Sequence, residues 1–155
     1  MRNSKSTLRN AIDTFFSSSA YAVVGVSANR KKFGNVVYRH MLEKGFVVYP
    51  VNPKLGVVED RKCYPSLLEL PNEVETVVTV VPPAVTEEVL ANLHKKGVRA
   101  VWMQPGSESE SSIKLAREHD IVVVHRECIL MHLEPVKPIH AAHRWVNKLV
   151  GLYPK

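Results

Sequence analysis

The stretch Tyr21–Gly34, which reads YAVVGVSANRKKFG, decides the fold of this chain. Its first part, Tyr21–Val26, is a short apolar run followed by a serine, a pattern that predicts a buried β-strand. Apolar residues then recur at helical spacing over residues 36–44, and Gly45 marks the expected end of that helix. A strand, a loop between two glycines and a helix, in this order, form the first unit of a parallel α/β sheet.

The same alternation continues along the chain. Valine-rich runs predict further strands over residues 46–51, 76–81, 98–103 and 121–124, and helices are expected over residues 84–95 and 107–119. Ser107 and Glu110 form a capping-box pair that opens the second of these helices. Because the strands are apolar on both faces, they belong to a parallel sheet that helices cover on both sides.

We therefore predict an α/β fold, a Rossmann-like, doubly wound parallel sheet in three layers, α/β/α. Residues 52–75 are ambiguous. A short strand over residues 62–64, before a small helix over residues 66–70, would complete the Rossmann strand order 3-2-1-4-5-6.

The chain has 155 residues, the length of one ordinary domain. We expect a single domain over residues 1–155, with end helices at about 7–17 and about 140–150. Hydrophobic residues make up 45% and charged residues 23%, which excludes a largely disordered chain. The two cysteines exclude a disulfide framework, no apolar run is long enough to span a bilayer, and residues 1–20 lack the apolar core of a signal peptide. We therefore expect a cytoplasmic protein.

Ligands of open parallel sheets bind beyond the carboxyl ends of the strands, where the strand order reverses. In the predicted order this point lies between the first strand and the strand that ends at Val81. Three segments follow strands there, over residues 25–34, 52–54 and 81–83. The net charge of +6 is compatible with a phosphate-bearing ligand, with nucleic acid or with ordinary solvated charge.

The first segment follows a strand and precedes a helix, as a phosphate-binding loop must, because free backbone N–H groups and the helix dipole then face the anion. It departs from G-x-G-x-x-G, with Ser27 and Arg30 in place of the second and third glycines, and it is not a P-loop. It carries Arg30, Lys31 and Lys32. The alternative is an ordinary loop with solvated charges.

The second segment is Asn52-Pro53-Lys54, where an NAD site requires an acidic residue for the ribose 2′-hydroxyl. A cation there suits an adenosine with a phosphorylated ribose, such as CoA with its 3′-phosphate or NADP with its 2′-phosphate. Lys54 could equally be an exposed loop lysine. The third segment, Val81-Pro82-Pro83, is rigid enough to line an adenine or pantetheine slot, or it simply starts a helix.

Five motifs together resemble a known family. They are G-V-S-x-x-x-x-K-F-G-N at 25–35, V-N-P-K at 51–54, Y-P-S-L at 64–67, V-V-P-P at 80–83 and V-W-M-Q-P-G at 101–106. Over about residues 10–135 the chain resembles stand-alone CoA-binding domain proteins, which are related to the amino-terminal CoA-binding domain of the succinyl-CoA synthetase alpha subunit. The resemblance implies a Rossmann-like domain that grips the nucleotide half of coenzyme A.

Carried onto this sequence, the resemblance implies that Gly25, Val26 and Ser27 wrap the CoA phosphates and that Lys54 lies near the adenosine phosphate. The candidate binding residues, taken from the three segments and the resemblance together, are Gly25, Val26, Ser27, Ala28, Arg30, Lys32, Phe33, Gly34, Asn52, Pro53, Lys54, Val81, Pro82, Pro83, Met103 and Gln104. We expect the chain to lack the phosphohistidine and nucleotide-grasp domains of the synthetase. We therefore expect binding of CoA or an acyl-CoA without catalysis, and we assign no catalytic residue.

Other functions stay open at this point. An NADP-dependent oxidoreductase, a nucleotide-sensing regulatory protein and, as a weaker hypothesis, a nucleic-acid-binding protein are the alternatives. Cys128 could form a mixed disulfide with CoA or be a packed, inert thiol. With His132, His140 and His143 it could also bind a metal, but no recognisable ligand pattern is complete, so we expect none. A protein partner or a homodimer is compatible with the sequence; a membrane or nucleic-acid partner is not expected.

Overall fold

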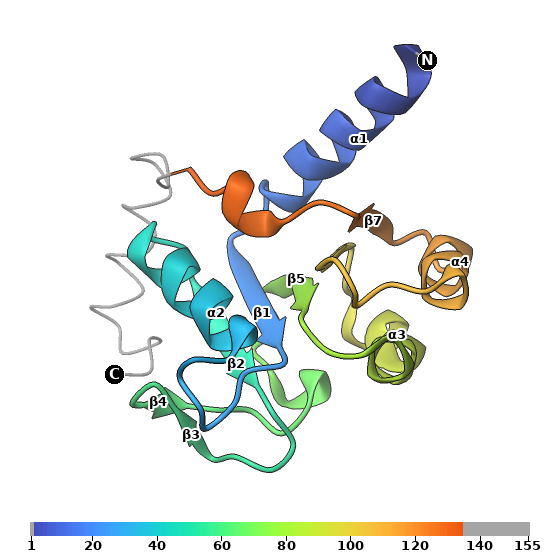
Figure 1. Ribbon diagram of the computed structural model, residues 1–155. Helices are drawn as coiled ribbons and strands as arrows, with labels where there is room; N and C mark the ends of the chain where they lie inside the picture. The colour runs from blue at the N-terminus through green and yellow to red at the C-terminus, as the bar shows by residue number, and fades with distance from the viewer. Residues whose placement is uncertain (1, 135–155) are drawn as a thin grey trace.

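The structure is a computed structural model that describes residues 2–134 (Figure 1). Its helices are α1 (Arg2–Phe15), α2 (Phe33–Glu43), α3 (Pro83–Lys96) and α4 (Glu110–Glu118), with short 3₁₀ helices η1 (Leu67–Glu69) and η2 (Ile129–Met131). The strands of the main sheet are β1 (Ala20–Val24), β2 (Val48–Val51), β5 (Val74–Thr79), β6 (Ala100–Met103) and β7 (Val122–His125). Strands β3 (Val57–Val58) and β4 (Arg61–Lys62) form a separate antiparallel ribbon.

The main sheet is parallel throughout, in the order β2-β1-β5-β6-β7. Strand β1 is central, with Tyr21 opposite Val48 of β2 on one side and Thr76 of β5 on the other. The predicted α/β class and the Rossmann-like winding are therefore confirmed. The strand order reverses between β1 and β5, which is the predicted switch point.

The additional strand expected over residues 62–64 is reduced to a single bridge. Tyr64 pairs in parallel with Val51; its amide donates to the Pro50 carbonyl oxygen (2.9 Å) and its carbonyl oxygen accepts from the Asn52 amide (3.0 Å). Pro65 follows directly and has no N–H to continue the ladder. Residues 61–62 pair with β3 instead, so the outermost position of the Rossmann order holds one residue.

Helices cover both faces of the sheet, which gives the three predicted layers (Figure 1). Helices α1, α2 and η2 pack on one face around Phe15, Tyr38 and Trp102, whereas α3, α4 and η1 pack on the other. The Trp102 indole is fully buried, lies 5.2 Å from the Phe15 ring between centroids, and donates to the Glu127 carbonyl oxygen (2.8 Å). Alternate residues of each central strand thus feed two separate cores.

The expected cap of the fourth helix is wrong by two residues. Ser109, not Ser107, is the cap: its hydroxyl accepts from the Ser112 amide (3.0 Å) and its amide donates to the Ser112 hydroxyl (2.8 Å). The chain first turns at Gly106, whose φ is 91°, so Ser107 is buried below the helix start. The C-terminal helix expected at about 140–150 lies outside the described residues.

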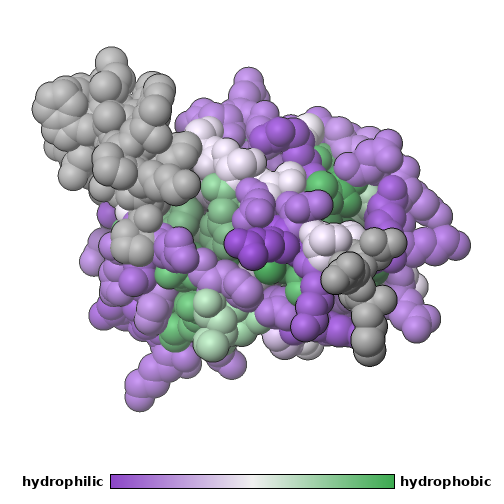
Figure 2. Space-filling model, turned by 90° about the horizontal axis from the view of Figure 1, so that it is seen from above, coloured by the Kyte–Doolittle hydropathy of each residue, from purple (hydrophilic) through white to green (hydrophobic). Residues whose placement is uncertain are grey.

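The surface seen in Figure 2 is mostly hydrophilic, with apolar patches between the polar side chains. Among the described residues, the large apolar side chains that are exposed are Phe33, Val57, Leu68, Val85 and Met131. Within residues 2–134, no helix is long and apolar enough to cross a membrane.

Two glycines bring three backbone segments into direct contact at the switch point. A Cβ atom on Gly25 would collide with the Val80 carbonyl oxygen just after β5, and one on Gly34 would collide with the Gly25 carbonyl oxygen. Gly25 also has a φ of 117°, which side chains rarely adopt. The first turn of α2 therefore packs directly on the end of β1.

Replacing Gly34 by alanine should destabilise the fold by about 2–3 kcal/mol, because the added methyl group meets rigid backbone rather than a side chain that can move. Urea unfolding followed by circular dichroism measures this loss. Gly56→Ala is the matched control, since nothing lies within 4 Å of its added Cβ. It should change stability by less than about 0.5 kcal/mol. Equal unfolding midpoints for the two variants would contradict the close packing.

Candidate functional site

The three segments predicted to bind a ligand meet at one edge of the sheet. Gly25 contacts Val80, and the Asn52 side-chain amide donates to the Val26 carbonyl oxygen (2.8 Å). The strands β1, β2 and β5 are parallel, so their carboxyl ends lie at this edge together. The loops after all three strands are thus held together by contacts within the protein.

Side chains shape the loop that follows β1. The Ser27 hydroxyl accepts from the Asn29 amide (3.1 Å), and the Asn29 side-chain oxygen accepts from the Lys31 amide (3.0 Å). The Lys32 amide donates to the Asn29 carbonyl oxygen (3.1 Å). These local turns take the place of the second and third glycines of G-x-G-x-x-G, which explains how the longer loop keeps a defined path.

Asn35 holds the base of this loop. Its side chain is fully buried in the first turn of α2, where it accepts from the Ser27 amide and donates to the Ser27 carbonyl oxygen, both at 2.8 Å. It also donates to one Glu59 oxygen (3.2 Å). Asn35 belongs to the motif at 25–35, but the sequence analysis assigned it no role. The available signal was an asparagine directly after Gly34, at the expected start of a helix.

Glu59 joins the loop to the β3–β4 ribbon and was missed from sequence, because nothing local links residue 59 to the loop. Its carboxylate accepts from the Arg30 Nε (2.9 Å), the Arg39 Nη1 (2.8 Å) and Asn35, and its side chain is 8% exposed. Burial alone would raise the pKa of this carboxyl. The hydrogen bonds from Asn35, Arg39 and Arg30 outweigh burial, so the pKa of Glu59 lies below its ordinary value.

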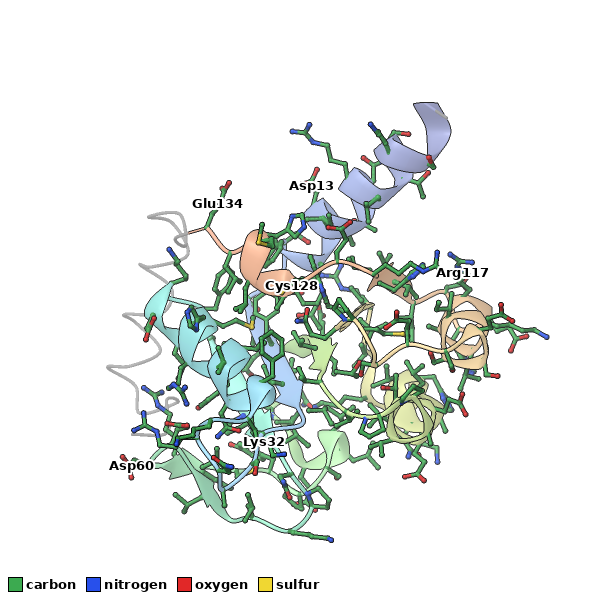
Figure 3. All side chains as sticks on the ribbon, viewed as in Figure 1. Asp13, Lys32, Asp60, Arg117, Cys128 and Glu134 are labelled. Carbon is green, nitrogen blue, oxygen red and sulfur yellow. The ribbon has the colours of Figure 1, made fainter. Side chains whose placement is uncertain are left out.

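Exposed lysines surround the same edge. Lys31, Lys32 and Lys54 are exposed, and no ion pair within residues 2–134 engages them. Figure 3 shows Lys32 at the start of α2, beside the loop. Lys54 is presented by a turn in which its own amide donates to the Asn52 side-chain oxygen (2.8 Å). Ala28 and Pro53 are exposed nearby, whereas Val26 is buried.

The remaining candidates divide into surface and interior residues. Pro82 is exposed at the start of α3, while Val81 is fastened by hydrogen bonds to the buried Ser107. Met103 and Gln104 are buried. The Gln104 side chain accepts from the Ile129 amide (2.8 Å) and donates to the Cys128 sulfur (3.6 Å), so it holds η2 against the end of β6.

Cys128 lies at the start of η2, apart from Lys32 in Figure 3. His132 pairs with Glu127 (2.9 Å), and His140 and His143 lie outside the described residues. Among residues 2–134, no three His, Cys, Asp or Glu side chains lie close enough together to hold a metal ion.

An open groove of about 540 Å³ lies elsewhere, beside α4. It is lined by Glu110, Ile113, Lys114, Arg117, Glu118 and His125. Burial lowers the pKa of His125, and Arg126 and Arg117 act in the same direction, so this ring is neutral at pH 7. The groove mixes charges of both signs and has no fixed glycine loop. The edge at β1, β2 and β5 is therefore the stronger candidate site.

A parallel sheet with helices on both faces, and a loop at its switch point that hydrogen bonds hold in place, define a Rossmann-like α/β domain. Residues 19–134 match a family model described as a CoA binding domain, which is most of the chain. The chain therefore belongs to the CoA-binding domain family, and the family predicted from the motifs is confirmed.

Known relatives agree with this assignment. The chain is 32% identical to an ADP-forming acetate–CoA ligase II of Archaeoglobus fulgidus, over 74% of this chain, and 34% identical to the alpha subunit of an ADP-forming acetate–CoA ligase II of Pyrococcus furiosus, over 72%. These matches span only 19% and 25% of the relatives' lengths. A solved structure, a conserved hypothetical protein from Pyrococcus furiosus, superposes with a TM-score of 0.70 at 38% identity, covering 73% of this chain and 97% of that one.

Glu59→Gln should cost about 1–3 kcal/mol of stability at pH 7, because hydrogen bonds to a charged acceptor are lost. The folded-state pKa is depressed, so this stabilisation is present above the unfolded pKa of about 4.3 and is lost as the pH falls through the folded value. The difference between wild type and variant should therefore shrink between about pH 5 and pH 3. Urea unfolding across this range measures it.

Asp60→Asn is the matched control for that measurement, since Asp60 lies in the same turn but outside the Glu59 network. It should follow the wild-type curve. A constant gap between Glu59→Gln and wild type at all pH values would show that the Glu59 charge contributes nothing.

Proposed function

We propose that this protein binds coenzyme A or an acyl-CoA, and that it grips the nucleotide half at the edge formed by the loops after β1, β2 and β5. The observation that carries the proposal is the loop over residues 25–34, which is held at both ends. Lysines at the start of α2 flank it and form no ion pair within residues 2–134. Membership of the CoA-binding domain family supports it.

The start of α2 suits a diphosphate. The backbone amides of Phe33 and Gly34 have no hydrogen-bond acceptor among residues 2–134, as is usual in the first turn of a helix. The helix dipole adds positive potential there, and Lys31 and Lys32 supply full charges. Glycine at position 34 keeps the turn close to the sheet, so the anion lies directly beyond β1.

The end of β2 suits a phosphorylated ribose rather than the free ribose of NAD. Asn52 takes the place of the required acidic residue, and both ends of its side chain are already bonded, to the Val26 carbonyl oxygen and the Lys54 amide. A neutral amide that already binds two backbone groups is a weaker acceptor for a 2′-hydroxyl than the carboxylate of an NAD site. The same turn presents Lys54, whose charge suits a ribose phosphate.

The two curated relatives named above are ligases, but the chain matches only a part of each, and we assign no chemical step to any residue of the site described here. We therefore propose binding as the activity of this domain. NADP binding is the second candidate, because Lys54 suits a 2′-phosphate as well as a 3′-phosphate. A nucleotide-sensing role would use the same site.

Isothermal titration calorimetry should show CoA binding at least tenfold tighter than NAD, because NAD offers no ribose phosphate to Lys54 and meets no acidic partner. NADP should fall between the two, since it presents a phosphate at the neighbouring ribose position but lacks pantetheine. NAD binding equal to CoA would overturn the proposal. NADP binding tighter than CoA would favour the oxidoreductase alternative.

Lys54→Ala should weaken CoA binding about tenfold and spare dephospho-CoA, which lacks the 3′-phosphate. One charge-assisted contact at an exposed position is worth about 1.5 kcal/mol, close to a factor of ten in affinity. The loss should shrink at high salt, which screens an exposed pair. Lys44→Ala, an exposed lysine at the other end of α2, is the control and should change neither affinity. If the ratio of the CoA and dephospho-CoA affinities is unchanged in Lys54→Ala, another cation binds the 3′-phosphate.

A further inference from the structure

The turn between β3 and β4 carries backbone strain that its own sequence does not relieve. Glu59 and Asp60 connect the two short strands, with φ of 52° and 61°. A two-residue turn with both residues in the left-handed region normally uses asparagine, aspartate or glycine. A glutamate there costs about 1 kcal/mol, which the interactions of the Glu59 side chain must offset.

The Glu59 side chain offsets this cost by accepting hydrogen bonds that hold two parts of the loop after β1. One oxygen accepts from Asn35, which holds the Ser27 amide and carbonyl group at the start of the loop. The other accepts from Arg30, further along. Arg39 connects the two ends, since its Nη1 donates to Glu59 (2.8 Å) and to the Arg30 carbonyl oxygen (2.9 Å).

Arg30 is held through its Nε, which leaves its two terminal nitrogens available to a ligand. Glu59 engages its Nε, and within the described part of the chain the two terminal nitrogens have no partner. The side chain is 72% exposed, against 28% for Arg39. A guanidinium fixed at Nε still presents two parallel donors, the arrangement that matches a pair of phosphate oxygens.

We propose that Glu59 is the positioning residue of the coenzyme site: it holds the loop over residues 27–32 in its binding form and directs the terminal nitrogens of Arg30 toward the ligand diphosphate. This inference rests on the proposed function. The two arginines outweigh the single carboxylate, so the cluster of Arg30, Arg39 and Glu59 keeps a net charge of +1 and does not repel an anion. Glu59 itself does not touch the ligand.

The decisive pair of variants is Glu59→Gly and Asp60→Gly. Both place glycine at a left-handed position and so relieve backbone strain, but only the first removes the carboxylate that contacts the loop. Glu59→Gly should weaken CoA binding about tenfold and adenosine 3′,5′-bisphosphate, which lacks the diphosphate bridge, less than threefold. Asp60→Gly should change either affinity less than twofold.

A double-variant cycle tests whether Glu59 acts through Arg30. Arg30→Ala should weaken CoA binding about tenfold by itself. If Glu59 orients Arg30, adding Glu59→Gly to Arg30→Ala should cost less than a further threefold, because the group it positions is already absent. Fully additive losses would overturn that part of the proposal.

Hydrogen exchange at the Ser27 amide gives a measurement that needs no ligand. This amide donates to Asn35, so its exchange should be slow in wild type and in Asp60→Gly, and at least tenfold faster in Glu59→Gly. Unchanged exchange in Glu59→Gly would overturn the loop-holding role. If wild type binds no CoA, the proposed function and the role of Arg30 both fail, while the exchange result still decides whether Glu59 holds the loop.

Discussion

The exclusion of any side chain at Gly25 and Gly34 is the constraint on which the rest of this structure depends. The backbones of the end of β1, the start of α2 and the end of β5 touch there, with no room for a Cβ atom. That contact sets the distance between helix and sheet and directs the first amides of α2 over the switch point. The loop between the two glycines must bow outward, because both of its ends are held at the same place.

Polar side chains, rather than further glycines, then define the path of that loop. Asn35 clamps Ser27 from the helix, and Glu59 reaches across from a ribbon that the main sheet does not contain. Both are nearly or fully buried, and their hydrogen bonds are satisfied. A half-satisfied network at this depth would be costly, so the ribbon, the helix and the loop are mutually dependent. This offers a physical reason for the short ribbon, which adds little apolar packing of its own.

At the same sheet edge, the end of β6 is covered by protein. Gln104 holds η2 against the end of β6, and Met103 packs beneath α4, where the Ser112 hydroxyl lies 3.5 Å from its sulfur. The exposed lysines lie instead in the loops after β1 and β2. Met103 and Gln104, which the sequence placed beside the ligand, are therefore buried residues that pack inside the domain.

Sequence periodicity alone determined the parallel sheet, its two covered faces and the position of the loop between Gly25 and Gly34, since these follow from local patterns that each strand and helix carries in its own residues. It also placed Lys54 after β2. Only the tertiary structure decided that Ser109 caps α4, that Tyr64 contributes one bridge instead of a strand, and that Glu59 meets Arg30 across 29 positions of sequence. Those outcomes depend on which distant groups become buried together. The hydrogen-bond donors of a buried carboxylate are its neighbours in the folded structure, and these can be far away along the chain.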